Sequence, residues 1–203
     1  MKSDIITAFR KLKVSFLQSV IITVNDKNKQ KGSIMKIKKS VGLIVLVEMP
    51  NLGLAAALQR RGRYDFEEGK RESWPGGCQV TVHGNLKEGE DFKEALLREA
   101  AEELGEVAAG MIYECSVDLV EVFHLKTEEK EVFTFAMKMD FAFVEAIRLG
   151  PSTDGLRPVR QDEIADIKDL FSYGKNAGVP FANTIAMFPD EKAALIRAFE
   201  FFS

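Results

Sequence analysis

Three glutamates, Glu99, Glu102 and Glu103, stand at spacings of i, i+3 and i+4 in the chain. If this segment is helical, their side chains lie on one face, because successive residues rotate by about 100°. Like charges placed in this way repel one another unless cations neutralise them. Clustered carboxylates suit hard divalent cations, and Mg²⁺ in particular works with phosphate-bearing substrates. The pattern therefore points to a helix that holds a divalent cation beside a phosphate group.

The surrounding residues predict a helix that begins after Asp91 and ends at Gly105. Asp91 can cap the N-terminus, with Glu94 as its capping-box partner, and glycine is a natural C-terminal stop. An apolar stripe runs beside the acidic one and consists of Leu96, Leu97, Ala100, Ala101 and Leu104. Read alone, this pattern is also that of an ordinary amphipathic helix with a solvated acidic face.

Composition limits the class of protein. A chain of 203 residues, 46% of them hydrophobic, can build one sizeable core. A net charge of -3 gives no global attraction to nucleic acid. Two cysteines, Cys78 and Cys115, are too few for a disulfide framework, which fits a reducing compartment. The longest apolar run, Val41–Val47, is shorter than a membrane span and no leader pattern is present, so we predict a cytoplasmic protein without a membrane partner.

Hydrophobic periodicity predicts strands on both sides of the central helix. The expected strands are 19–24, 33–37, 41–48, 54–60, 78–82, 115–125 and 131–140, and 141–149 is a candidate extension of the last. Helices are expected at 4–19 and from Pro189 onward, and 150–157 is expected to be a loop. This order indicates an α+β fold or α/β sandwich.

Seven residues match fixed positions of a known motif: Gly84, Glu90, Arg98, Glu99, Glu102, Glu103 and Gly105. The segment resembles the Nudix box, G-x5-E-x7-R-E-U-x-E-E-x-G-U, in which U is a bulky aliphatic residue. A chance match of all seven positions has a probability on the order of 10⁻⁸ per window. The chain departs from the box at its last position, where Glu106 replaces the aliphatic residue and Val107 follows.

The resemblance implies the Nudix fold, an α/β/α sandwich with a mixed sheet between helices. We expect residues 40–203 to form this domain and residues 1–39 to form an N-terminal extension of a helix and a hairpin. Nudix relatives with such extensions often dimerise through them, so we predict a homodimer.

The resemblance also implies an activity, the Mg²⁺- or Mn²⁺-dependent hydrolysis of a diphosphate linkage. Glu99 and Glu103 are the expected metal ligands, with Glu102 beside them and the carbonyl of Gly84 as a backbone ligand. Arg98 is expected to orient a box glutamate, and Glu90 to brace the loop. The expected partner is a small-molecule diphosphate, a nucleoside diphosphate derivative such as a nucleotide sugar or ADP-ribose. No nucleic-acid partner is expected.

Other charged residues are candidates for the same site. Arg60, Arg61 and Arg63 precede the box and can bind phosphate bidentately, although loop arginines are as often solvated. Many Nudix enzymes place a late loop carboxylate as base or extra ligand. Glu163 stands at that place, with Asp162 as the competing candidate.

Two other functions remain open at this point. Residues 74–84 are similar to the Nudix branch of isopentenyl diphosphate isomerases, which use a cysteine just upstream of the box. Here that position is His83, and Cys78 lies five residues earlier. Some Nudix domains bind a nucleotide without cleaving it, but such a module is expected to lose a metal glutamate. Tyr64, Phe66 and Trp74 can stack a nucleobase or pack in the core, and the sequence does not select one nucleoside diphosphate derivative.

Overall fold

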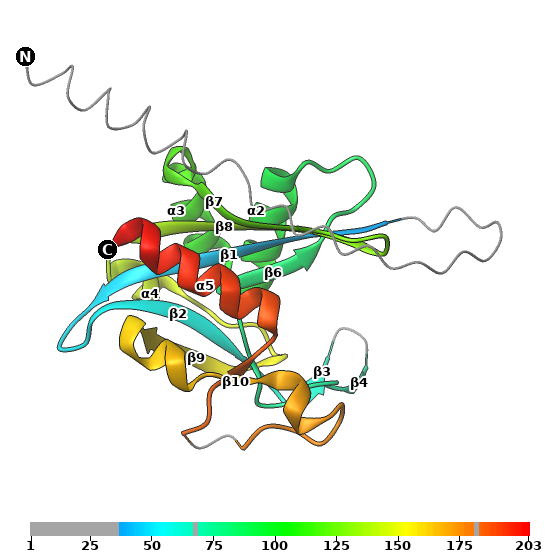
Figure 1. Cartoon of the computed structure of the whole chain (residues 1–203). Helices are drawn as coiled ribbons and strands as arrows, with labels where there is room; N and C mark the ends of the chain where they lie inside the picture. Colours follow the sequence, from blue (N-terminus) through cyan, green and yellow to red (C-terminus); the bar gives the residue numbers. More distant parts are fainter. Residues whose placement is uncertain (1–36, 67–68, 181–182) are drawn as a thin grey trace, which may run out of the picture.

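The computed structural model describes residues 37–66, 69–180 and 183–203. A seven-stranded mixed sheet lies between helices on its two faces (Figure 1). This arrangement confirms the predicted α+β sandwich. The helix predicted at 4–19 and the hairpin predicted from 19–24 to 33–37 fall outside the described residues, apart from Ile37. The predicted division between 1–39 and 40–203 stays a prediction.

Strand β1 is the centre of the sheet. It pairs in parallel with β8, over the register Lys38↔Lys130 to Val47↔Met139, and antiparallel with β2 and β6. Strand β7 completes one side, and β5 and β9 pair with β2. The strands of this sheet are β1 (Lys38–Met49), β2 (Gly53–Arg61), β5 (Cys78–Gln79), β6 (Val82–Asn85), β7 (Val120–Lys126), β8 (Lys130–Met139) and β9 (Thr153–Arg160). Two short pairs lie apart from it, β3 (Tyr64–Asp65) with β4 (Lys70–Arg71) and β10 (Lys168–Asp169) with β11 (Ala186–Met187).

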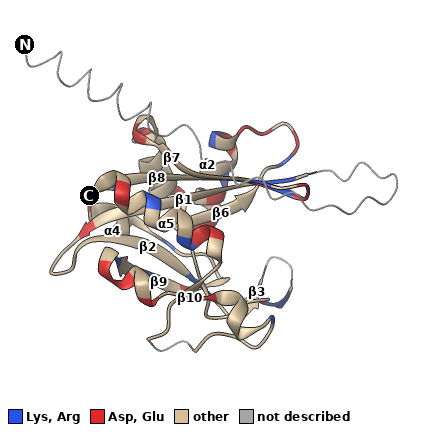
Figure 2. Ribbon diagram, in the orientation of Figure 1, with Lys and Arg blue, Asp and Glu red and all other residues tan. Residues whose placement is uncertain are grey.

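Both faces of the sheet are covered, which explains why β1 is apolar along nearly its whole length, with charged residues only near its ends (Figure 2). Helices α2 (Phe92–Leu104), α3 (Glu106–Glu114) and α4 (Ala142–Ala146) cover one face, where Leu96, Ile112 and Phe143 are fully buried. Helix α5 (Pro189–Phe202) covers the other face with Leu195 and Phe199. Short 3-10 turns span Ser116–Asp118, Gln161–Asp166 and Leu170–Tyr173. No helix in the described part of the chain is long and apolar enough to cross a membrane.

Several segments differ from the sequence predictions. Residues 106–114 form a helix that was not predicted, and β7 begins only at Val120 instead of Cys115. Gly105, at φ 86°, turns the chain so that a second helix starts at once and buries Ala108 and Ile112. Residues 141–149 do not extend β8. Helix α4 lies there instead and places Phe143 in the core.

The segment predicted as a loop, 150–157, contributes most of strand β9. The segment contains Gly155, and Pro158 directly follows it; both residue types weaken strands. Among the described strands, β9 pairs only with β2 and so lies at an edge of the sheet. An edge strand tolerates a proline, since one side of its backbone needs no partner strand. The strand predicted at 78–82 is also divided, into β5 and β6.

Candidate active site

Helix α2 begins as the sequence predicts, with a complete capping box. The Asp91 carboxylate accepts a hydrogen bond from the Glu94 backbone N–H at 2.8 Å, and the Asp91 N–H donates to Glu94 Oε2 at 3.0 Å. Leu96, Ala100 and Leu104 pack into the core and fix how the helix is rotated. With that face buried, the box glutamates lie at the side of the helix next to β6 and the end of β2.

Glu99 lies directly against Gly84 in strand β6. A Cβ atom added to Gly84 would overlap the Glu99 carboxylate. Strand β6 is held by β1 through the pairs Val41↔Gly84 and Leu43↔Val82, so the backbone at Gly84 has little room to move away. Only glycine leaves space for the glutamate at this contact, and the contact brings a carboxylate and a strand backbone together.

Arg98 joins the box loop to the box glutamates. Its Nε and Nη2 donate to the two oxygens of Glu90, at 2.7 and 2.9 Å, and Nη2 also donates to the Asn85 carbonyl at 2.9 Å. Its Nη1 donates to Glu99 at 2.8 Å and to Glu102 at 3.3 Å. The Arg98 hydrogen bonds lower the pKa of Glu90 to about 2, and Glu90 in turn raises the pKa of Arg98. This bidentate pair holds the loop against the helix.

Glu103 is partly buried, whereas Glu102 is exposed. Its Oε2 accepts hydrogen bonds from the His83 backbone N–H at 3.1 Å and from Gln59 Nε2 at 3.0 Å. Burial, together with the neighbouring charge of Glu99, raises the pKa of Glu103 to about 8. The two hydrogen bonds act in the opposite direction but do not offset burial. A cation beside Glu103 would favour its ionised form.

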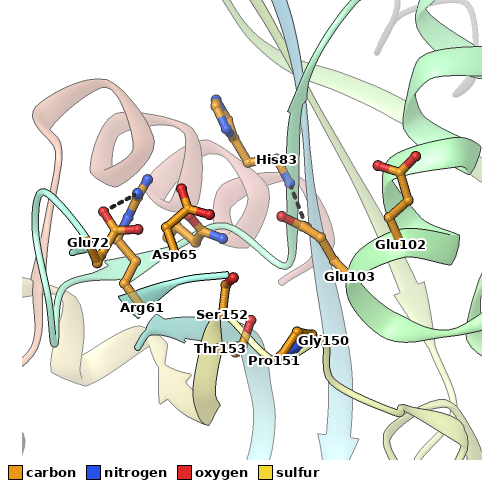
Figure 3. A pocket seen from close by; sticks show the side chains of 11 residues that line it. Arg61, Asp65, Glu72, His83, Glu102, Glu103, Gly150, Pro151, Ser152 and Thr153 are labelled. Atoms are coloured by element: carbon orange, nitrogen blue, oxygen red, sulfur yellow. Dashed lines mark hydrogen bonds and ion pairs between the residues drawn. The ribbon is translucent and has the colours of Figure 1, made fainter. Parts of the chain in front are cut away.

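A cavity of about 190 Å³ opens beside Glu103 (Figure 3). Glu102 and Glu103 enter it from α2, and residues from β2, the β3–β4 hairpin and the start of β9 line the opposite wall. The lining residues are Arg61, Asp65, Glu72, Gln79, His83, Glu102, Glu103, Gly150, Pro151, Ser152 and Thr153. The wall is polar, with more carboxylates than cationic groups, and its chemistry suits a polar ligand accompanied by cations.

The three candidate arginines lie in different places. Arg61 lines the cavity, where its Nη1 is 3.3 Å from Glu72 Oε1, and its guanidinium lies 5.8 Å from the centre of the Phe188 ring. Arg60 contacts the buried thiol of Cys78, which belongs to the core on the α5 side. Arg63 is exposed and is not among the residues that line the cavity. Arg61 is therefore the arginine that the structure brings to the site.

Glu163 and Asp162 are not brought to this cavity. Glu163 accepts a hydrogen bond from the Arg160 N–H at 2.9 Å, and Asp162 pairs with the Arg160 guanidinium. Arg160 is the last residue of β9, whereas Thr153, the first, lines the cavity. Seven steps along the strand separate Thr153 from Arg160 by roughly 23 Å, at about 3.3 Å per residue. In this structure both carboxylates serve the turn that follows β9.

His83 contributes its backbone to the site and directs its ring away from Glu103 (Figure 3). Burial, followed by the charge of Arg61, lowers the pKa of His83 to about 4, so its ring is neutral near pH 7.

The three aromatic residues considered for stacking a nucleobase lie in different environments. Trp74 packs edge to face against Phe171 and Phe188, whereas Phe66 and its neighbour Tyr64 are exposed.

Several lining residues were not predicted from the sequence, among them Asp65, Glu72 and Thr153. Asp65 and Glu72 lie in a segment that reads as polar and irregular, and Thr153 falls in the segment predicted as a loop. Gln59, whose amide contacts Glu103, could have been identified from the sequence pattern. It is a polar residue directly after five apolar positions of a strand, and a polar residue buried there needs hydrogen-bond partners inside the protein.

The described residues contain no cluster of three or more His, Cys, Asp or Glu side chains already arranged around a metal position. The donor chemistry nevertheless fits a divalent cation. Glu99, Glu102 and Glu103 offer only oxygen ligands, which Mg²⁺ and Mn²⁺ prefer. Arg98 Nη1 lies between Glu99 and Glu102, so these two carboxylates already share a positive charge. A cation would also stabilise the ionised form of Glu103, whose pKa is raised by burial.

The sequence model of the NUDIX domain matches residues 38–186, nearly the whole of the sheet and the box helix. The chain therefore belongs to the Nudix family. With the fixed box residues in place on β6, on α2 and in the segments next to them, it is a Nudix pyrophosphohydrolase.

Solved structures of low sequence identity share the fold. A mutT/nudix family protein from Listeria innocua is 15% identical, with a TM-score of 0.52 over 81% of this chain and 93% of that one. The NUDIX domain of Shewanella oneidensis NrtR, complexed with ADP ribose, is 12% identical, with a TM-score of 0.51 over 83% and 90%. A MutT/nudix family protein from Enterococcus faecalis is 14% identical, with a TM-score of 0.50 over 94% and 68%. No curated protein matches the chain in sequence.

Proposed function

We propose that this protein hydrolyses the diphosphate linkage of a nucleoside diphosphate derivative with the help of Mg²⁺ or Mn²⁺. The observation that carries the proposal is the placement of Glu103 at the wall of a polar cavity, one helical turn from the Glu99 carboxylate that lies against Gly84. Glu99, Glu102, Glu103 and the Gly84 carbonyl would hold the cation. When bound, it would screen the charge of the diphosphate and lower the pKa of a water molecule.

The residues of the chain have separate tasks in this proposal. Arg98 orients Glu99 and Glu102 through hydrogen bonds from its Nη1. Its own position is fixed by the bond to Glu90. Arg61 lines the cavity, where its guanidinium could bind a phosphate oxygen of the substrate. The ion pair with Glu72 fixes the orientation of this guanidinium. Glu163, far from the cavity, is assigned no role in the reaction. Asp65 and Glu72 are the lining carboxylates outside the proposed cation-binding set, and either could accept a proton from water.

A change of Glu103 to Gln tests the proposal. It keeps the shape of the side chain but removes its charge, and we expect kcat to fall on the order of 10²–10³-fold while the protein stays folded. The matched control is Glu106→Gln, an exposed carboxylate at the start of α3, which should leave kcat unchanged. The substrate panel should include nucleotide sugars and ADP-ribose. ADP ribose is also the compound bound by the Shewanella domain. Full activity of Glu103→Gln, or of the wild-type protein in excess chelator, would contradict the proposal.

The isomerase alternative has less structural support. Cys78 is fully buried and packs in the core on the α5 side of the sheet, whereas the box helix lies on the other side. Burial raises the pKa of the Cys78 thiol. A binding module that does not cleave its ligand is distinguished by the same panel, through binding without product. The cytoplasmic location and the homodimer remain proposals from the sequence.

A further inference from the structure

Gln59 is a fully buried amide at the boundary between the core and the cavity. It lies on β2 on the same face as Ala55 and Ala57, both of which pack beneath α2. None of its surface is exposed. A buried amide without partners is costly, so this position is stable only if its donors and acceptor are all engaged.

Three hydrogen bonds engage the amide and settle its orientation. Nε2 donates to the Thr81 carbonyl at 2.7 Å and to Glu103 Oε2 at 3.0 Å, and Oε1 accepts from the Thr153 hydroxyl at 2.8 Å. The Thr81 carbonyl can only accept, so the NH₂ group must face it. The oxygen of Gln59 must then face Thr153, whose hydroxyl donates its single proton to it.

These bonds fix one oxygen of Glu103 from two strands. Gln59 approaches from β2 and the His83 N–H from β6, and both donate to Oε2. The remaining oxygen, Oε1, is then the one that can bind a cation at the cavity. Thr153, which lines the opposite wall of the cavity, holds the amide by its hydrogen bond to Gln59 Oε1. A continuous path of two side-chain hydrogen bonds therefore joins the cavity wall on β9 to the carboxylate on α2.

We propose that Gln59 is a positioning residue, which together with Thr153 holds Glu103 in the orientation that binds the divalent cation. The inference rests on the proposed function, because it assumes that Glu103 is a cation ligand. It differs from a purely structural role, in which Gln59 only satisfies the Thr81 carbonyl. If the role of Gln59 is only structural, its substitution should lower the stability of the protein and leave cation affinity unchanged. If Gln59 positions Glu103, its substitution should also weaken cation binding. Partners that orient metal ligands typically account for about 10–100-fold in metal affinity.

The test measures Mn²⁺ binding to the full chain by electron paramagnetic resonance, without substrate. We expect Gln59→Leu to weaken Mn²⁺ binding about 10–100-fold. Thr153→Val should weaken it less, since Gln59 keeps its bond to Glu103, and Thr153→Ser should restore the wild-type affinity. The matched control is Leu58→Val, the adjacent position on the opposite face of β2. It should lower the melting temperature without changing Mn²⁺ affinity. For any substrate found by the panel, kcat should fall in Gln59→Leu while KM changes little.

Wild-type Mn²⁺ affinity in a folded Gln59→Leu protein would overturn the inference. If that variant does not fold, Thr153→Val decides, and unchanged Mn²⁺ affinity in it would overturn the inference equally. A wild-type protein that binds Mn²⁺ but cleaves no substrate would contradict the proposed function and leave this inference standing, because binding is measured separately from hydrolysis.

Discussion

Gly84 and Glu99 form a contact that requires glycine at position 84, because a Cβ atom there would overlap the Glu99 carboxylate. The contact joins a strand held in register by β1 to a helix held by its apolar face. It explains physically why the box begins with glycine, fifteen positions before Glu99.

We predict that Gly84→Ala displaces Glu99 and lowers kcat on the order of 10–100-fold. The added methyl group overpacks the contact, so the free energy of unfolding should also fall, by about 1–3 kcal/mol. Steady-state kinetics and denaturant unfolding provide the measurements. Gly89→Ala is not a suitable control because Gly89 has a φ of 87°, whereas Gly110, in α3 with open space around it, is suitable. Unchanged kcat in Gly84→Ala would contradict the prediction.

Arg98→Lys should lower both activity and melting temperature. Lysine keeps the charge but cannot make two parallel hydrogen bonds to Glu90 while it also contacts Glu99 and Glu102. We expect about a tenfold loss of kcat, because the glutamates lose their orienting partner. Arg197→Lys is the control, since Arg197 forms an exposed pair with Glu200 on α5, away from the box. Equal activity of Arg98→Lys and wild type would show that the bidentate pair is dispensable.

Cation binding should release a proton from Glu103. Burial raises the pKa of this group to about 8, so it is largely protonated at pH 7, whereas a cation ligand must be ionised. Apparent Mn²⁺ affinity should therefore rise by up to about tenfold per pH unit below pH 8 and level off above it. Calorimetry in buffers of different ionisation enthalpy measures the released proton. Mn²⁺ affinity that does not change between pH 6 and 8 would be the contrary outcome.

Glu191, in the first turn of α5, should make stability depend on pH. Burial raises its pKa to about 7, and one of its oxygens, Oε2, is buried without a hydrogen-bond partner. The folded state therefore holds a proton that the unfolded state releases at its lower, unperturbed pKa, so stability falls as pH rises from about 5 to 7. At pH 8, Glu191→Gln should be more stable than wild type by about 1–3 kcal/mol. At pH 4, below both pKa values, this advantage should disappear. Urea unfolding at both pH values checks the difference.

Residues 1–39 are predicted to mediate a homodimer. The segment contains an apolar stretch, Ser19–Val24, that needs a partner surface. Light scattering should give a dimer for the full chain and a monomer for a chain that starts at Lys36. A monomeric full chain would contradict this prediction directly.

The sequence was sufficient for the sheet centre and for the box helix, because each depends on local patterns. The apolar run at Val41–Val47 predicts a buried strand, and Asp91, Glu94 and Gly105 define the ends of α2. The opposite wall of the cavity was not predictable in this way. Thr153 reaches the site only because β9 pairs with β2, a contact between distant segments that a proline and a glycine obscured. The position of Glu163 likewise depends on the length of β9.

The parallel pairing of β1 with β8 also has a consequence for synthesis of the protein. β1 finds its antiparallel neighbours β2 and β6 soon after it leaves the ribosome, but β8 follows only after the box helix and β7. Until then, one edge of the most apolar strand in the chain lacks its native partner. Closing so distant a pair is slow, and an unpaired apolar edge promotes aggregation. Chains that stop before Met139 should therefore be the ones that depend most on chaperones.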